Sequence, residues 1–219
     1  TASERQHQKD REDTKMELYI FRHGRTVWNA AGKIQGSTDI ELTEEGRQMA
    51  EETAKNIKNI HFDAIYSSPL KRAYETACIL KGNRQMEVVK DDRLRELNFG
   101  VLEGTSFMNI KEGGADGRYS VFFTRPELYE RPEGGESLEE LCERGHSFLE
   151  MIYETYPEDA RIMIVAHGAM NKALLKNIRG LEMKDLWYGR LQQNCAATIV
   201  KLYKDGFEVV DGSRIFYSL

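Results

Sequence analysis

The sequence predicts an α/β fold: a single three-layer α/β/α domain whose mostly parallel sheet carries helices on both faces. Short apolar runs alternate with amphipathic, helix-like segments along most of the 219 residues, which is the pattern of parallel α/β sheets. The clearest apolar runs, residues 18–21 and 161–166, have the length of buried strands. No internal repeat or interdomain linker interrupts the alternation, so one domain is expected.

Composition and charge narrow the class of protein. Hydrophobic residues make up 40% of the chain and charged residues 31%, as in a soluble protein with a packed core. The net charge of -5 gives no reason to expect nucleic acid or an anionic membrane as a partner. No apolar run approaches the roughly 20 residues of a membrane span, and no signal peptide is visible. We therefore expect a cytoplasmic protein; nothing in the sequence indicates its oligomeric state.

The cysteines favour a reducing compartment. Cys78, Cys142 and Cys195 are odd in number, far apart and surrounded by apolar neighbours. We expect three buried free thiols rather than a disulfide framework. Cysteine and histidine do not cluster at zinc-binding spacing, so no metal site is expected.

The N-terminal segment differs from the rest of the chain in composition and periodicity. Residues 1–15 are polar, charged and aperiodic, and are interpreted as a flexible leader or a remnant of recombinant expression. The catalytic domain is expected to span residues 16–219. Residues 18–21 predict its first strand. After a loop with two glycines, Thr43 is the expected N-cap of a helix with two glutamates in its first turn.

The next elements repeat the strand-then-helix order. Residues 62–67 predict the second strand. Ser68 and Pro69 are expected to start a helix over residues 70–80, as N-cap and first helical residue. Residues 86–89 predict a third, short strand.

Residues 105–136 are the least periodic part of the chain. They hold two glycine pairs and two of the four prolines, and are interpreted as an irregular insertion or lid with one short helix. Ser137 followed by Glu140 forms a capping box, which predicts a long helix reaching about Tyr156.

The C-terminal part contains the clearest strand, residues 161–166, followed by a helix to about Arg179. Residues 196–203 and 207–210 predict two final strands, joined by a Lys-Asp-Gly turn.

Chemically useful side chains follow two of these strands. Arg22 and His23 come directly after the first strand, and His167 comes directly after the strand at residues 161–166. Ligands of open α/β sheets bind at the carboxyl ends of the strands, so two imidazoles are expected at one edge. Arg72, near a helix start, reaches the same edge. Such a pocket suits a phosphoryl group, because arginine's planar fork matches its oxygens and helix N-termini add amide donors.

These residues belong to a longer ordered series of motifs. The series comprises Arg22-His23-Gly24, Asn29, Gln35-Gly36, residues 42–46, residues 67–73, residues 94–96, residues 134–137 and residues 165–168. It resembles the histidine phosphatase superfamily, the phosphoglycerate-mutase-like proteins with their RHG motif. The resemblance extends from Met16 to about Leu175.

The resemblance implies a mechanism and assigns its residues. His23 would attack phosphorus and become phosphohistidine, which divides one hard displacement into two easier ones. Arg22, Arg72 and His167 would bind the oxygens of the transferring group. Glu96 would protonate the leaving alkoxide and then take a proton from water.

Further implied phosphate contacts are Asn29, Gln35 with Gly36, and Gly168. The resemblance implies no metal and no other cofactor, because fixed cations neutralise the charge. Many members carry glutamate directly after the RHG glycine, where this chain has Arg25. That arginine either adds a cation near the pocket or points to solvent, so it bears on substrate preference.

Some assignments have competitors within the chain. Glu103 and Glu136 compete with Glu96 for the acid role, and the Leu-Arg-Glu context favours Glu96. The walls of the leaving-group side are expected from residues 105–136. A final sequence-based expectation concerns three aromatic residues that should pack in the interior rather than stack on substrate: Trp28, Trp187 and Tyr188.

The sequence is compatible with three functions. The favoured one is hydrolysis of a small phosphorylated metabolite by a broad-specificity or α-ribazole phosphatase-like enzyme. Phosphoglycerates, fructose bisphosphate and phosphorylated peptides are other implied substrates. A phosphoglycerate mutase is less favoured, because such mutases usually carry a longer, more basic segment after the acid residue. Here residues 99–131 carry only four cations: Lys111, Arg118, Arg125 and Arg131. A non-catalytic binder of phosphorylated ligands is least favoured, because the catalytic set is complete.

Overall fold

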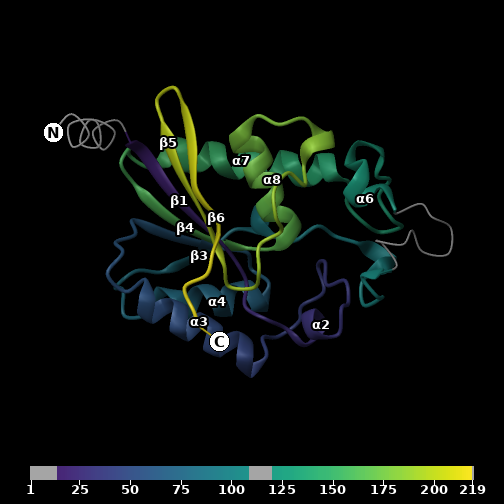
Figure 1. Ribbon diagram of the computed structural model, residues 1–219, viewed down its shortest axis with the longest axis horizontal. Helices are drawn as coiled ribbons and strands as arrows, with labels where there is room; N and C mark the ends of the chain where they lie inside the picture. The colour runs from purple at the N-terminus through teal and green to yellow at the C-terminus, as the bar shows by residue number, and fades with distance from the viewer. Residues whose placement is uncertain (1–13, 109–119, 219) are drawn as a thin grey trace.

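A six-stranded sheet lies between two layers of helices (Figure 1). The computed structural model describes residues 14–108 and 120–218. The strands are β1 (Thr14–Arg22), β2 (Ala64–Ser67), β3 (Val88–Lys90), β4 (Arg161–Ala166), β5 (Ala197–Tyr203) and β6 (Gly206–Arg214). The α-helices are α2 (Val27–Ala30), α3 (Glu44–Asn56), α4 (Lys71–Lys81), α6 (Val121–Thr124), α7 (Leu138–Thr155) and α8 (Gly168–Arg179). Short 3-10 turns are η1 (Asp92–Leu94), η2 (Gly100–Leu102), η3 (Pro126–Leu128) and η4 (Met183–Asp185). The predicted α/β class is confirmed.

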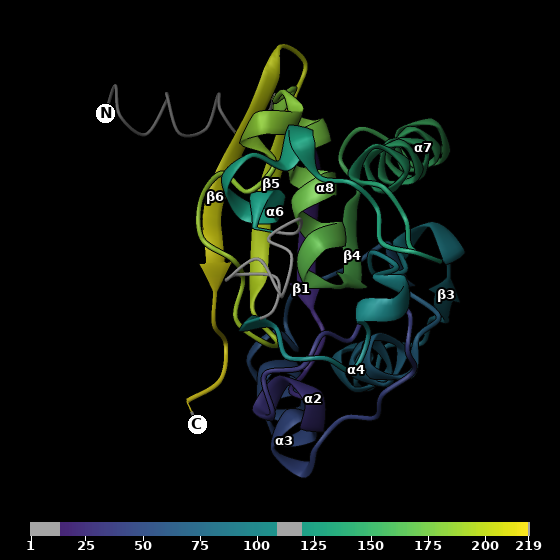
Figure 2. The same ribbon diagram turned by 90° about the vertical axis from the view of Figure 1, so that its right-hand side faces the viewer.

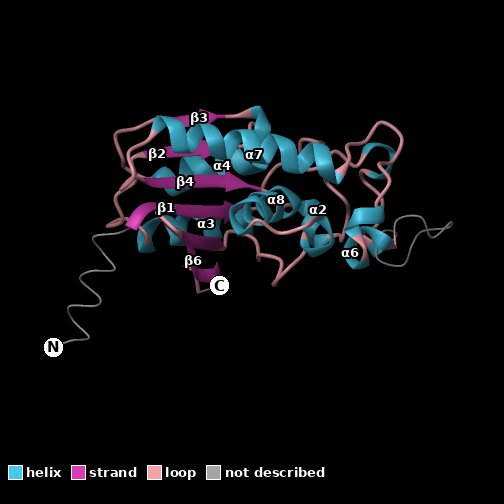
Figure 3. Ribbon diagram, turned by 90° about the horizontal axis from the view of Figure 1, so that it is seen from above, coloured by secondary structure: helices cyan, strands magenta, loops and turns pink. Residues whose placement is uncertain are grey.

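The sheet order is β3-β2-β4-β1-β5-β6. The first four strands in that order are mutually parallel, whereas β5 pairs antiparallel with both β1 and β6. A tight turn can join only antiparallel neighbours, which explains the direction of the terminal pair. Figure 2 shows β6 at the edge of the sheet opposite β3. Figure 3 shows the parallel strands pointing toward the end where α2 and α6 lie.

Both faces of the sheet are buried. Leu18 and Ile20 of β1 pack in the core beneath α7 and α8, while Phe21 packs in the core over α3 and α4. Successive side chains of a strand point to opposite faces, so a strand covered on both faces reads as a continuous apolar run. This burial explains why the apolar runs were readable as strands.

The helix caps at α3 and α7 are confirmed. The Thr43 hydroxyl accepts a hydrogen bond from the Gly46 amide at 3.0 Å. Ser137 and Glu140 form the reciprocal capping box at the start of α7. Each cap satisfies amide donors that have no partner inside the helix.

The predicted start of α4 is wrong. Leu70 is the N-cap, so Ser68 and Pro69 lie before the helix. The Ser68 hydroxyl instead lies 2.8 Å from the Nε2 atom of His167, a long-range contact that local sequence cannot indicate. The same hydroxyl also accepts from the Leu70 amide at 3.3 Å, so a tertiary hydrogen bond is added to the local one.

Other boundaries also differ from expectation, and the expected lid is described only in part. β1 begins at Thr14, so the last two residues of the expected leader belong to the strand, while residues 1–13 lie outside the described part. β6 continues to Arg214 because it pairs along β5. In the expected lid, residues 105–108 and 120–136 are described and contain α6 and η3, whereas residues 109–119 lie outside the described part.

The cysteine prediction is partly wrong. All three thiols are free, and Cys142 and Cys195 are buried, but Cys78 is exposed. The buried face of α4 runs through Ala73, Ala77 and Leu80, so Cys78 lies on its outer side. Among the helices described, none has the length and apolar character needed to cross a membrane.

Candidate active site

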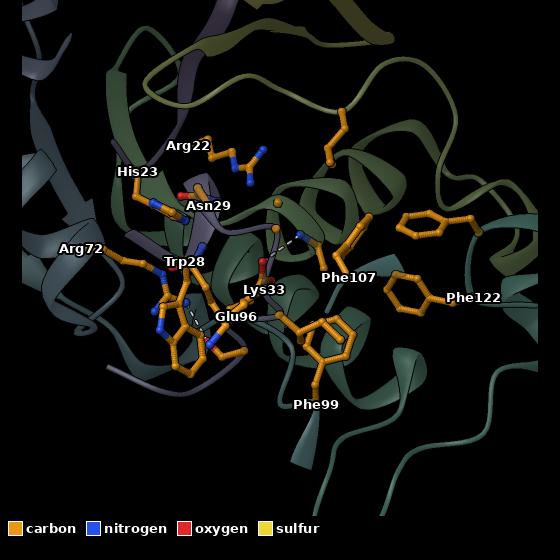
Figure 4. A pocket seen from close by; sticks show the side chains of 18 of the residues that line it. Arg22, His23, Trp28, Asn29, Lys33, Arg72, Glu96, Phe99, Phe107 and Phe122 are labelled. Carbon is orange, nitrogen blue, oxygen red and sulfur yellow. Dashed lines mark hydrogen bonds between the residues drawn. The ribbon is translucent and has the colours of Figure 1, made fainter. Parts of the chain in front are cut away.

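A cavity of about 250 Å³ opens at the carboxyl ends of the parallel strands. Arg22 at the end of β1 pairs with Ala166 at the end of β4, so the residues that follow, His23 and His167, emerge side by side. Figure 4 shows Arg22, His23 and Arg72 on one side of the cavity, with Trp28 beside Arg72, and phenylalanine rings on the other side. The location at strand ends agrees with the sequence-based expectation.

His23 is a neutral imidazole, and one of its two ring nitrogens is hydrogen-bonded to the backbone. Its Nδ1 atom lies 2.7 Å from the Gly24 carbonyl oxygen. A carbonyl can only accept, so Nδ1 carries the proton and Nε2 keeps its lone pair. Burial holds the pKa of His23 well below its ordinary value, and the charges of Arg72 and Arg22 lower it further. The unprotonated Nε2 is therefore able to act as a nucleophile at neutral pH.

His167 lies beside His23 but behind the cavity wall. The two ring centroids are 5.2 Å apart. His167 Nδ1 accepts from Arg72 Nε at 3.2 Å, and Nε2 donates to the Ser68 hydroxyl at 2.8 Å. Its pKa is also well below the ordinary value, through burial and then the charge of Arg72. The structure thus brings the two imidazoles together, with His167 orienting Arg72 rather than facing the cavity.

Two guanidinium groups line the cavity, that of the fully buried Arg72 and that of the half-buried Arg22. Arg72 is fully buried and donates to the carbonyl oxygens of Thr38 at 2.8 Å and Gly36 at 2.7 Å. Burial lowers the pKa of Arg72 to about 10, so it stays a cation at neutral pH. Arg22 donates through Nη1 to the Gln192 carbonyl at 2.7 Å, and its Nε is buried without a partner among the described residues. A buried donor without a partner is costly unless a ligand accepts from it, which points to an anion site.

Glu96 is the carboxyl group of the cavity. Its Oε1 accepts from the amides of Leu97 at 2.9 Å and Met170 at 3.1 Å, and Oε2 accepts from Ala169 at 3.2 Å. Two of these amides open α8, so the carboxylate also satisfies the positive end of that helix. The side chain is consequently held in a fixed orientation at the cavity.

The two competing carboxylates have structural positions. Glu103 accepts from the amides of Ser37 at 2.7 Å and Phe99 at 3.1 Å. Glu136 pairs with Arg144 at 2.6 Å. Neither side chain lines the cavity, so Glu96 is the carboxylate placed for chemistry.

The remaining expected phosphate contacts also line the cavity: Asn29, Gln35, Gly36 and Gly168. Thr26 fixes both amides. Asn29 Oδ1 accepts from the Thr26 amide at 3.1 Å, and Gln35 Oε1 accepts from the Thr26 hydroxyl at 2.8 Å. With their oxygens occupied, both amides keep the NH₂ group as the side that can donate to an anion.

Comparison with known proteins identifies the family. A model described as the histidine phosphatase superfamily (branch 1) matches residues 18–213. The chain belongs to this superfamily. The probable phosphoglycerate mutase GpmB of Escherichia fergusonii is 37% identical over 166 residues, which cover 76% of each chain. Phosphoserine phosphatase 1 of Hydrogenobacter thermophilus is 31% identical over 177 residues, covering 78% of this chain and 80% of that protein.

A solved structure of another relative superposes along most of the chain. A phosphoserine phosphatase mutant from Entamoeba histolytica, in complex with phosphoserine, gives a TM-score of 0.78 at 30% identity. The match covers 91% of this chain and 98% of that one. The fold and family expected from the sequence are thus confirmed.

Arg25, the departure from the usual histidine phosphatase motif, does not line the cavity. Its Nη1 atom pairs with Glu45 Oε1 of α3 at 2.8 Å, and both side chains are exposed. The solvent-facing alternative is correct, so this substitution adds no cation to the site.

The cavity wall away from His23 is aromatic. Three phenylalanines of the expected lid region form part of it: Phe107, Phe122 and Phe123. That part of the expected wall is confirmed. Trp28 and Trp187, expected to pack in the interior, also line the cavity, whereas Tyr188 is 65% exposed. No periodic signal links these residues, because they come from separate short helices and loops.

Two residues that hold the catalytic set were missed from the sequence. The Ser68 hydroxyl holds His167, as described above. Gln192 is buried, accepts from Arg22 through its carbonyl, and donates from Nε2 to the Ile20 carbonyl at 2.8 Å. Its position depends on the antiparallel pairing of β5 with β1, and no local sequence motif indicates that pairing.

The two neutral histidines predict a pH dependence of stability. Both have folded-state pKa values lowered from about 6.5, so below pH 6.5 the unfolded chain binds more protons. Their contribution is complete above that pH and is lost as pH falls toward the lowered values. We expect a loss of about 1.4 kcal/mol per pH unit for each histidine in this window. Urea unfolding between pH 7 and 5.5 measures it.

The His23→Gln variant provides the control for this measurement. Removing one titrating imidazole should remove about half of the slope that the pair produces. An unchanged slope in the variant would show that His23 is not held neutral by the fold.

Proposed function

We propose that this protein hydrolyses phosphate monoesters of small organic molecules through a phosphohistidine formed on His23, without a metal ion. The observation that carries the proposal is the meeting of four groups in one cavity. These are a neutral imidazole with a free Nε2 lone pair, two guanidinium groups and one oriented carboxyl. The histidine phosphatase family and its phosphatase relatives support it.

In the proposed first step, Nε2 of His23 attacks phosphorus and the ester oxygen departs in line. Arg22 and Arg72 donate to the peripheral oxygens, where negative charge builds up in the transition state. Glu96, in its protonated form, gives its proton to the leaving alkoxide. The Gly24 carbonyl stabilises the charged ring by accepting from Nδ1.

In the proposed second step, water attacks the phosphohistidine from the side that the alcohol vacated. Glu96, now a carboxylate, accepts a proton from that water, and inorganic phosphate leaves. His167 acts through Arg72 by fixing its guanidinium plane. Asn29, Gln35 and the cavity-facing backbone at Gly36 and Gly168 would complete the phosphate contacts.

No step of this scheme requires a metal, because the two arginines supply the positive charge at the transferring group. The expected result is full activity in the presence of a strong chelator. A loss of activity that added divalent metal restores would contradict this part of the proposal.

A phosphoglycerate mutase is the second candidate, because relatives such as GpmB carry that name. The charge of the cavity favours hydrolysis. Of the cations between residues 99 and 131 that are described, Arg131 pairs with Glu140 at 2.9 Å, and neither it nor Arg125 lines the cavity. Lys111 and Arg118 lie outside the described part. A bisphosphoglycerate would therefore find few described cations beyond those that bind one phosphoryl group.

The test is one incubation with two readouts. The protein is supplied with 3-phosphoglycerate, with and without bisphosphoglycerate primer, and inorganic phosphate release and isomerisation are both followed. A panel of other phosphate esters is run in parallel, and the enzyme is quenched in acid-free conditions to trap phosphohistidine. Brisk isomerisation with negligible phosphate release would make it a mutase. No turnover and no trapped phosphohistidine would leave a non-catalytic binder.

A further inference from the structure

The cavity has a second half that phosphoryl chemistry does not use. We infer that the preferred substrates are phosphate esters of small, uncharged aromatic alcohols, and this inference rests on the proposed function. The leaving group would lie against an aromatic wall consisting of Trp28, Phe99, Phe107, Phe122, Phe123 and Trp187.

Most of the rings of the aromatic wall pack against one another. The Phe122 centroid lies 4.7 Å from that of Phe123, 4.7 Å from that of Trp187 and 5.6 Å from that of Phe99. Phe107 lies 5.5 Å from Phe123. The Trp187 indole also donates to the Phe122 carbonyl, which ties the loop after η4 to α6. A preformed cluster of this kind binds a flat ring without first having to order its own side chains.

The charges of the cavity are concentrated at its phosphoryl end. Among the described lining residues, the charged side chains are Arg22, Arg72, Glu96 and Lys33. The first three are assigned to the transferring group. Lys33 is exposed and stands 5.7 Å from the Trp28 ring centroid. The aromatic half of the described lining therefore holds no carboxylate and a single solvated ammonium.

This distribution disfavours charged leaving groups. The serine of phosphoserine would bring an ammonium and a carboxylate into the cavity, and its ammonium would find no described carboxylate besides Glu96. Burying a charge without a partner costs more free energy than the phosphoserine carboxylate would gain by pairing with the flexible, exposed Lys33. An uncharged ring has no such cost and gains from the removal of its surface from water.

The size of the cavity bears on the size of the alcohol that it can surround. Its volume of about 250 Å³ is just below the roughly 300 Å³ at which pockets hold drug-sized ligands. The phosphoryl group takes part of that space. The remainder suits a body of one or two fused rings.

The experiment compares kcat/KM for esters whose alcohols have similar acidity, so that differences report binding and not leaving-group reactivity. Benzyl phosphate and 2-naphthylmethyl phosphate are compared with O-phosphoserine, 3-phosphoglycerate and glycerol phosphate. We expect kcat/KM to be about 100-fold higher for the aromatic esters, which corresponds to the free energy gained by burying roughly one ring.

The Phe107→Ala variant tests whether the aromatic wall is the cause. Phe107 is 36% exposed, so its removal leaves the core intact, and the ratio of aromatic to aliphatic kcat/KM should fall about tenfold. Phe207→Ala on β6 is the matched control, because Phe207 is 40% exposed and outside the cavity. It should leave the ratio unchanged.

The outcomes separate the two proposals. Phosphate release from phosphoserine or 3-phosphoglycerate that equals or exceeds release from the aromatic esters would overturn the substrate class while the proposed hydrolysis stands. An aromatic preference that survives Phe107→Ala unchanged would overturn the role of the wall. Absence of release from every ester would overturn the proposed function itself.

Discussion

The His23→Ala variant is expected to lose turnover by about 10⁴-fold or more, the size of effect seen when a covalent nucleophile is removed. No neighbouring group can replace the lost lone pair. His167 is the nearest imidazole, but its Nδ1 accepts from Arg72 and its Nε2 donates to Ser68. The arginines would still bind the phosphoryl group, so KM should change much less than kcat.

The measurement is steady-state phosphate release, combined with the mass of protein quenched during turnover. Wild-type protein should carry one additional phosphoryl group, and the variant should carry none. His146→Ala is a suitable control, because His146 is an exposed histidine of α7 outside the cavity, with its Nε2 3.4 Å from Glu150. Full activity of His23→Ala would refute the assignment of the nucleophile.

The elements that could be predicted from the sequence are those fixed by local chemistry. β4 coincides with residues 161–166 because each of its side chains from Ile162 onward is buried, so the apolar run is the strand. The caps at Thr43 and Ser137 depend on residues three positions apart. Arg22 and His23 could be placed because they follow a strand directly, and a strand end in this fold is a site.

Long-range contacts decided what could not be predicted. The serine expected to cap α4 also contacts an imidazole 99 residues away in the chain. The indole of Trp187 meets the carbonyl of Phe122 across 65 residues. The aromatic wall is assembled from such long-range contacts, and no spacing along the chain encodes it. The aromatic side of the cavity is therefore the part of the candidate site that the sequence predicts least.

The burial of the catalytic set connects stability to function. Among the described residues, Arg72 is the largest side chain that is fully buried, and it donates hydrogen bonds to Thr38, Gly36 and His167. Those contacts fix its orientation before a substrate arrives, which is the condition for strong transition-state stabilisation. The same burial keeps both imidazoles neutral. The features that cost stability at acidic pH are therefore those that prepare the site for an anion.

The Glu96→Gln variant is expected to lower kcat/KM for alkyl phosphates by about 10²–10⁴-fold, because glutamine cannot carry the proton that the alkoxide needs. Glutamine keeps an oxygen that can accept from the amides of Leu97 and Met170, so the start of α8 should survive. The loss should be much smaller for formation of the phosphohistidine from p-nitrophenyl phosphate, whose leaving group needs no proton. Dephosphorylation still needs a base.

A pre-steady-state experiment separates these effects. Mixing Glu96→Gln with p-nitrophenyl phosphate should release a rapid burst of nitrophenol equal to the enzyme concentration, followed by slow turnover while phosphohistidine accumulates. Benzyl phosphate, matched in ring size, should give no burst. Glu103→Gln is the control, since Glu103 holds backbone amides away from the cavity and its loss should shift the melting temperature without creating a burst. If Glu96→Gln lowered the rate equally for both esters and gave no burst, Glu96 would serve only as a cap of α8. The effect of removing a proton donor must depend on the acidity of the leaving alcohol, whereas the effect of removing a helix cap does not.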